Sequence, residues 1–115
     1  MSYAEAGVGA PIVLVHGWAA NSAFFRDLAS ELAKSHRVYT LTLRGHPGSE
    51  AGAAPLTIET LANDIAHFFD GLDLKGATAL GWSMGAMALW AAPKTIISNL
   101  AYHRLCLVGK SNSSL

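Results

Sequence analysis

Short apolar runs alternate with amphipathic segments along this chain, and that alternation is what most restricts its fold. The runs "PIVLVHG" (11–17), "RVYTLTL" (37–43) and "ATALGW" (77–82) are typical of strands buried on both faces. Between them, apolar residues recur at helical spacing. Strands that alternate with helices form right-handed crossovers, which predict a parallel sheet covered on both sides. The expected fold class is therefore α/β.

The segments between the runs carry apolar stripes. The first segment has four apolar residues at i, i+3, i+4 and i+7: Phe25, Leu28, Ala29 and Leu32. The second has five on one helical face: Ile58, Leu61, Ile65, Phe68 and Leu72. We expect Thr57 to cap this second helix and a third helix to start at about Met84, with Pro93 bending or ending it. The segment "RLCLVG" (104–109) is a candidate fourth strand.

The pentapeptide Gly81-Trp82-Ser83-Met84-Gly85 matches the pattern G-x-S-x-G, with a predicted strand before it and a predicted helix after it. We expect the glycines to allow a tight turn, so that a strained serine presents its hydroxyl at the carboxyl end of the sheet. The helix would aim amide N–H groups at an oxyanion forming there. Ser83 is therefore the candidate nucleophile. The alternative is a glycine-rich turn with an incidental serine.

The tripeptide His16-Gly17-Trp18 follows the first predicted strand and strengthens this hypothesis. An acyl-transfer site needs two backbone N–H donors, one from the residue after the nucleophile and one from a neighbouring loop. Met84 would supply the first donor, and Trp18 or its neighbour the second. Gly17 would keep the loop backbone open, and Trp82 would line the substrate site beside it. His16 is expected to hold the loop by hydrogen bonding rather than to act as the base.

Residues 3 to about 92 resemble the N-terminal half of an α/β-hydrolase. Four stretches carry the resemblance, in this order: "AGVGAPIVLVHGW", "LTLRGHPGS", "LTIETLANDIAHFFDGLDL" and "ALGWSMGAMAL". Within the family, the combination of "HGW" with "GWSMG" is most similar to small carboxylesterases such as the pimeloyl-acyl-carrier-protein methyl ester esterases. The resemblance implies a serine hydrolase of carboxylic esters or thioesters that uses no metal and no cofactor.

The resemblance also implies a partial domain, a doubly wound, mostly parallel sheet that lacks the family's C-terminal strands and cap. Its strands would lie in the spatial order 37–43, 11–16, 77–82, 104–109. The chain, 1–115, would be the N-terminal part of the domain. The resemblance weakens after Ala92, and the sequence leaves open whether the tail is native or the product of a shifted reading frame.

The loop after the second strand departs from the family's pattern Asp-x-Arg-Gly-x-Gly-x-Ser. Thr42 stands where that pattern has Asp, and Pro47 replaces a Gly. The remaining positions fit: Arg44, Gly45, His46 and Ser49. Because this loop is mainly architectural, we expect the change to affect its geometry more than the chemistry.

The larger departure concerns the residues that should assist the serine. In the family the acid and then the histidine follow the nucleophile, but no Asp or Glu follows Ser83, and His103 is the only later histidine. We expect His103 to be a surface or helix-end residue, and Asp64, Asp70 and Asp73 to lie on the solvated face and end of the second helix. The chain alone should then be inactive. The alternatives are a non-catalytic half-domain and a binding module that reuses the pocket.

Composition narrows the range of partners. The eight basic and eight acidic side chains cancel, and no basic block suggests nucleic acid. The apolar run from Ile12 to Val15 is too short to span a membrane, and the single Cys106, expected in the core, cannot form an internal disulfide. We therefore expect a cytoplasmic protein, and the resemblance implies a small acyl ester as its substrate. An unpaired sheet edge would leave self-association possible.

Overall fold

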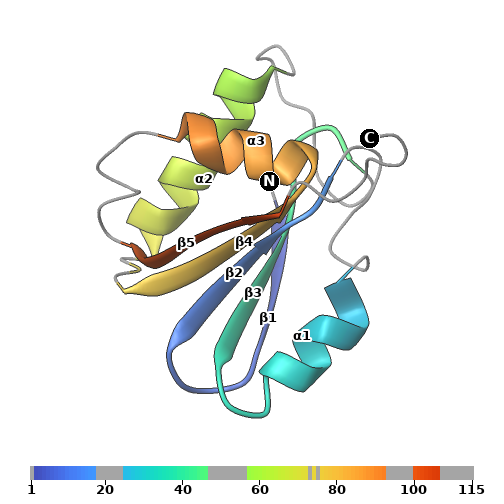
Figure 1. Cartoon of the computed structure of the whole chain (residues 1–115), viewed down its shortest axis with the longest axis vertical. Coiled ribbons are helices and arrows are strands. Elements are labelled where there is room, and N and C mark those ends of the chain that lie inside the picture. Colours follow the sequence, from blue (N-terminus) through green and yellow to red (C-terminus); the bar gives the residue numbers. More distant parts are fainter. Residues whose placement is uncertain are drawn as a thin grey trace.

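The computed structural model describes residues 2–17, 25–46, 57–72, 74, 76–92 and 100–106, with side chains through Ala92. In chain order, the elements of this described part are β1 (Ser2–Ala6), β2 (Pro11–Val15), α1 (Arg26–Leu32), β3 (Arg37–Thr42), α2 (Ile58–Gly71), β4 (Ala77–Trp82), α3 (Met84–Ala91) and β5 (Leu100–Cys106). Figure 1 shows α2 and α3 on one side of the sheet and α1 on the other. The expected α/β layering is confirmed.

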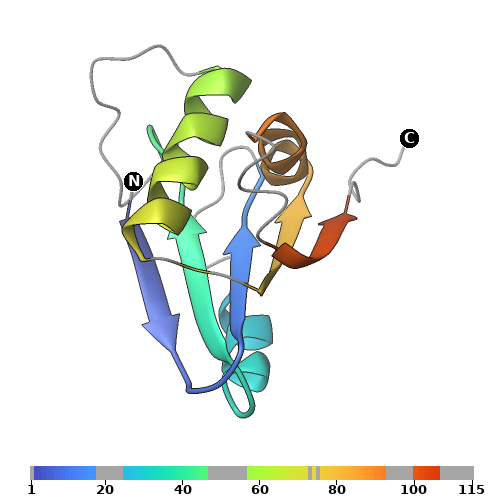
Figure 2. The ribbon, with the colours of Figure 1, turned by 90° about the vertical axis from the view of Figure 1, so that its left-hand side faces the viewer.

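The strands form one sheet in the order β1-β3-β2-β4-β5. The strands β3, β2, β4 and β5 run parallel, in the spatial order that the sequence predicted (Figure 2). The fourth parallel strand begins at Leu100 instead of Arg104, so its predicted bounds were wrong. Residues 107–109 lie outside the described part of the chain.

An antiparallel strand that the sequence did not predict, β1, completes the other edge of the sheet beside β3. The side chain of Glu5 pairs with Arg37 at 3.0 Å, and a second guanidinium nitrogen of Arg37 donates to the carbonyl of Gly7 at 3.2 Å. The ring of Tyr3 meets the ring of Phe68 edge-on, with centroids 5.1 Å apart. These contacts attach a largely exposed strand to the sheet and to α2.

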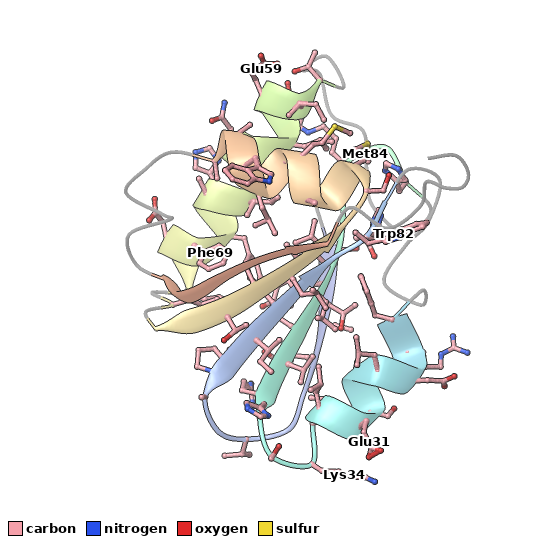
Figure 3. All side chains as sticks on the ribbon, in the orientation of Figure 1. Glu31, Lys34, Glu59, Phe69, Trp82 and Met84 are labelled. Atoms are coloured by element: carbon pink, nitrogen blue, oxygen red, sulfur yellow. The ribbon has the colours of Figure 1, made fainter. Side chains whose placement is uncertain are left out.

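The larger part of the core lies between the sheet and the helices α2 and α3. Its fully buried residues include Val13, Val15 and Leu41 of the strands and Leu43 directly after β3. From α2, Leu61, Ile65 and Phe69 pack onto these strands, and Figure 3 shows Phe69 on the side of α2 that faces the sheet. The predicted stripe is thus confirmed along most of α2, whereas Leu72 at the end of the helix is 37% exposed.

The opposite face of the sheet is covered by α1. Phe25 packs with Ile12, Leu14 and Val38. Three partly buried residues pack against this cluster: Ala29, Leu32 and Ala33. The prediction for Leu28 was wrong, since its side chain is 40% exposed. A helix of seven residues presents only a narrow face to the sheet, and Leu28 falls outside that face.

The ends of α2 and α3 follow local rules. The hydroxyl of Thr57 accepts a hydrogen bond from the N–H of Thr60 at 3.1 Å, which confirms the predicted cap. The helix α3 ends at Ala91, and Ala92 is extended with φ −62° and ψ 148°. Extended backbone is what a residue before proline prefers, so α3 ends before Pro93, which itself lies outside the described residues.

Candidate active site

Ser83 lies between β4 and α3, at the carboxyl ends of the parallel strands. Its φ of 54° and ψ of −113° make it the one non-glycine residue with positive φ in the described part of the chain. Such a conformation costs on the order of 1–3 kcal/mol and persists only where the surrounding structure enforces it. The predicted strained turn at Ser83 is therefore confirmed.

Two glycines flank this turn and let α3 approach the sheet. A Cβ on Gly81 would lie 2.6 Å from the amide nitrogen of Ala86, and a Cβ on Gly85 would overlap the carbonyl oxygens of Val15 and His16. Neither glycine is among the described residues with positive φ. The glycines thus allow the tight turn, as expected, by the space they leave and not by a positive φ of their own. The strained dihedral falls on the serine, and the glycines provide the space for the helix.

The first turn of α3 presents its amide groups next to Ser83. The carbonyl of Ser83 accepts the N–H of Met87 at 3.1 Å, which starts the hydrogen bonding of the helix. The N–H groups of Met84, Gly85 and Ala86 precede that bond, so they have no acceptor within the helix. The amide of Met84 is thus in the first turn, where the sequence placed it. Trp18, the other expected donor, lies outside the described residues.

His16 is buried directly after β2, and the backbone engages both of its ring nitrogens. The N–H of Leu43 donates to Nε2 at 2.9 Å, so Nε2 carries the lone pair and Nδ1 carries the proton. Nδ1 then donates to the carbonyl of Gly17 at 2.7 Å. Burial lowers the pKa of His16; the Gly17 bond opposes this shift, and His46 adds to it. A neutral imidazole whose two nitrogens both form hydrogen bonds with the backbone matches the expected role of holding the loop.

The indole of Trp82 lies against the backbone of Gly17. A Cβ on Gly17 would fall 2.6 Å from the ring atom Cε3 of Trp82. Because β2 pairs with β4 through Val15 and Gly81, the segments that follow these strands emerge side by side. Figure 3 shows Trp82 and Met84 at this same end of the sheet. The structure therefore brings His16, Gly17 and Trp82 together with the serine turn.

An ion pair that the sequence analysis missed lies next to this group. Nε and Nη2 of Arg44 donate to the two carboxylate oxygens of Asp64, each at 2.8 Å. The side chains are only 21% and 11% exposed, so the prediction of a solvated Asp64 was wrong. Asp70 is exposed as expected, and Asp73 lies outside the described residues. The fit of Arg44 to the family's loop pattern was the one signal that could have indicated the pair.

His103 lies in the middle of β5, where its backbone is paired with Ala79. Ala79 precedes Ser83 by four residues, which at about 3.3 Å per residue places this register position roughly 13 Å along the strands from the serine. The prediction of a helix-end position was therefore wrong. Among the residues with described surroundings, no three His, Cys, Asp or Glu side chains gather to hold a metal ion.

Comparison with known proteins agrees with this geometry. Residues 10–96 match the model of a protein family described as the alpha/beta hydrolase fold. The chain belongs to the α/β-hydrolase family. This α/β-hydrolase chain is 36% identical over 87 residues to a pimeloyl-[acyl-carrier protein] methyl ester esterase of Xylella fastidiosa. It is also 38% identical over 79 residues to ethanol acetyltransferase 1 of Hanseniaspora uvarum. The resemblance inferred from the motifs is confirmed.

The chain matches only part of each relative. The alignment with the esterase covers 75% of this chain and 32% of the relative, and that with the acetyltransferase covers 66% and 23%. The solved structure of an esterase from Exiguobacterium antarcticum superposes with a TM-score of 0.72 and 34% identity, over 77% of this chain and 34% of that one. This α/β-hydrolase chain thus spans about a third of its esterase relatives. In its described part, no helix is long and apolar enough to cross a membrane.

Proposed function

We propose that this chain carries the nucleophile of a carboxylic ester hydrolase and that Ser83 is that nucleophile. The observation that carries the proposal is the positive φ of Ser83 at the carboxyl edge of the sheet. Close packing of α3 on β2 and β4 enforces this costly conformation. A glycine would adopt the same conformation without the cost, so the fold itself gains nothing from a serine at this position. Membership in the α/β-hydrolase family and the esterase relatives support the same chemistry.

In the proposed mechanism, Oγ of Ser83 attacks the carbonyl carbon of a small acyl ester. The C=O bond opens to an oxyanion, and the amide N–H of Met84 donates to that oxygen together with an N–H from Trp18 or its neighbour. The general base proposed below takes the hydroxyl proton of Ser83 and gives it to the leaving alkoxide as the acyl–serine ester forms. The same base then removes a proton from the water that attacks this ester and returns it to Oγ of Ser83, which releases the acid. Gly17 and Trp82 line the site, while His16 is occupied by the backbone and takes no proton.

We further propose that this chain is the N-terminal part of a longer domain. The general base and its acid would then come from the rest of that domain. The support is that no Asp or Glu follows Ser83 and that the register position of His103 lies far from the serine. The esterase relatives also extend well beyond the matched region. Without a base the serine keeps its proton at neutral pH and is a weak nucleophile.

The relative that is an acetyltransferase favours a second candidate, transfer of the same acyl group to an alcohol. Both reactions pass through the acyl–serine ester and differ only in whether water or an alcohol attacks it.

The test uses p-nitrophenyl acetate with the 115-residue chain and added imidazole as a replacement base, in the presence and absence of ethanol. Release of nitrophenol in excess of that with imidazole alone supports the nucleophile if Ser83→Ala abolishes the excess, and ethyl acetate as a product favours transfer. Equal rates with Ser83→Ala would overturn the proposal.

A further inference from the structure

A continuous series of contacts runs from α2 to the end of β2, made of hydrogen bonds and one ring-to-ring contact between two histidines. Its members come from α2, from the turn after β3 and from the residue after β2: Asp64, Arg44, His46 and His16. We call these four residues the polar relay. It passes along the carboxyl edge of the sheet and ends at Gly17, whose backbone lies against the indole next to Ser83.

The first contact fixes the turn to α2. The guanidinium of Arg44 uses two nitrogens on the two oxygens of Asp64, at 2.8 Å each. This two-point contact fixes the plane of the guanidinium as well as its distance, which a single hydrogen bond would not do. Since both side chains are mostly buried, water competes weakly for these bonds. The backbone at Arg44 is therefore held in one place relative to α2.

The second contact fixes the ring of His46 to that backbone. Nδ1 of His46 lies 3.1 Å from the carbonyl oxygen of Arg44, which can only accept, so Nδ1 donates. The amide of His46 also donates to the carbonyl of Leu43 at 3.2 Å, which closes a turn. Gly45, the third residue of that turn, has φ 79°, a value that suits glycine.

The third contact joins the two histidine rings. The ring of His46 meets that of His16 edge-on, with centroids 4.9 Å apart and planes at 62°, and both side chains are buried. His16 also accepts the N–H of Leu43, the residue that opens the same turn. The turn thus holds His16 on two sides. His16 in turn holds the carbonyl of Gly17 at 2.7 Å.

We propose that Asp64 and Arg44 are positioning residues: through the turn that carries Leu43 and His46 they keep His16 in its Nδ1–H form and so fix the Gly17 backbone beside Ser83. The inference rests on the proposed function for its catalytic meaning, but the positioning itself is a property of this chain. Asp64 lies on α2 and acts on His16 through the side chains and the turn backbone that join them. Its predicted effect is on the state of a histidine that it does not touch.

The test follows the ring of His16 by nuclear magnetic resonance in the ¹⁵N-labelled 115-residue chain. Asp64→Asn is compared with Asp70→Asn, which removes an exposed carboxylate from the same helix. We expect wild type and Asp70→Asn to show Nε2 of His16 unprotonated at neutral pH. In Asp64→Asn, the titration midpoint of His16 should rise toward that of an ordinary histidine. The amide hydrogen of Leu43 should exchange about tenfold faster or more.

The direction of the shift separates positioning from simple charge effects. Loss of a negative charge alone would make protonation of His16 harder and lower its midpoint, whereas a loosened, better hydrated ring protonates more easily. Arg44→Lys keeps the positive charge but loses the two-point contact, and it should shift His16 as Asp64→Asn does. If Asp64→Asn does not fold, Arg44→Lys decides the question by the same signals.

An unchanged His16 tautomer, titration and Leu43 exchange in the folded variants would overturn the proposal and leave Arg44–Asp64 as an ion pair without this role. Ser83→Ala is the second control, since it should leave the His16 signals as in wild type. Failure of the proposed function would appear as no esterase activity at Ser83 with the relay signals as predicted. Failure of the relay would appear in the His16 signals whatever the activity.

Discussion

Gly17 lies so close to the indole of Trp82 that a Cβ on Gly17 would fall 2.6 Å from ring atom Cε3. This contact joins the segments that follow β2 and β4 and forms one wall of the candidate site. Gly17→Ala should force the indole to move and lower the free energy of unfolding by about 1–3 kcal/mol. Denaturant titration of Gly17→Ala, Trp82→Ala and the double variant measures the coupling. If the losses in free energy of unfolding of the two single variants add up to that of the double variant, the two residues do not press on one another.

The close packing of α3 on the sheet gives a second prediction, with a matched control. Gly85→Ala places a methyl group against the carbonyls of Val15 and His16, and it should destabilise the chain by about 1–3 kcal/mol. Gly71, at the end of α2, has no heavy atom within 4 Å of an added Cβ. Gly71→Ala should therefore stabilise the chain by up to about 1 kcal/mol. Thermal unfolding of both variants checks the contrast, and similar effects would contradict the close packing of α3.

The strain at Ser83 gives a third prediction. Glycine adopts positive φ without the steric cost that a side chain brings, so Ser83→Gly should raise the free energy of unfolding by about 1 kcal/mol relative to Ser83→Ala. Ser83→Ala keeps the Cβ and therefore the strain. Urea titration distinguishes the two variants. Equal stabilities would mean that the turn does not hold its residue in a costly conformation.

The pH dependence of stability follows from His16. Its pKa is lowered in the fold, chiefly by burial, so between that value and the ordinary value of about 6.5 the unfolded chain binds a proton that the folded chain does not. The contribution of His16 is thus complete above about pH 6.5 and is lost as the pH falls below it, at up to about 1.4 kcal/mol per pH unit. His16→Gln should flatten this slope in urea titrations from pH 7.5 to 5. An equally steep slope in that variant would contradict the assignment.

The sequence predicted the parts of this fold that depend on neighbouring residues. The G-x-S-x-G spacing between an apolar run and a helix predicted the strained Ser83, because both flanking elements are encoded next to it. The cap at Thr57 is equally local. What the sequence did not reveal depends on contacts formed across the fold. The strand β1 is mostly exposed and is defined by pairing with β3, and the Arg44–Asp64 ion pair joins residues 20 apart in sequence.

The central claim is that Ser83 is a nucleophile whose base is not among these residues, and covalent labelling tests it most directly. The folded 115-residue chain is treated with a fluorophosphonate, with and without imidazole, and the label is located by mass spectrometry, with Ser83→Ala as the control. We expect slow labelling without added base and faster, imidazole-dependent labelling confined to Ser83. Label elsewhere, equal labelling of Ser83→Ala or no labelling with imidazole would contradict the nucleophile. Rapid labelling of Ser83 without imidazole would show that this chain contains its own base.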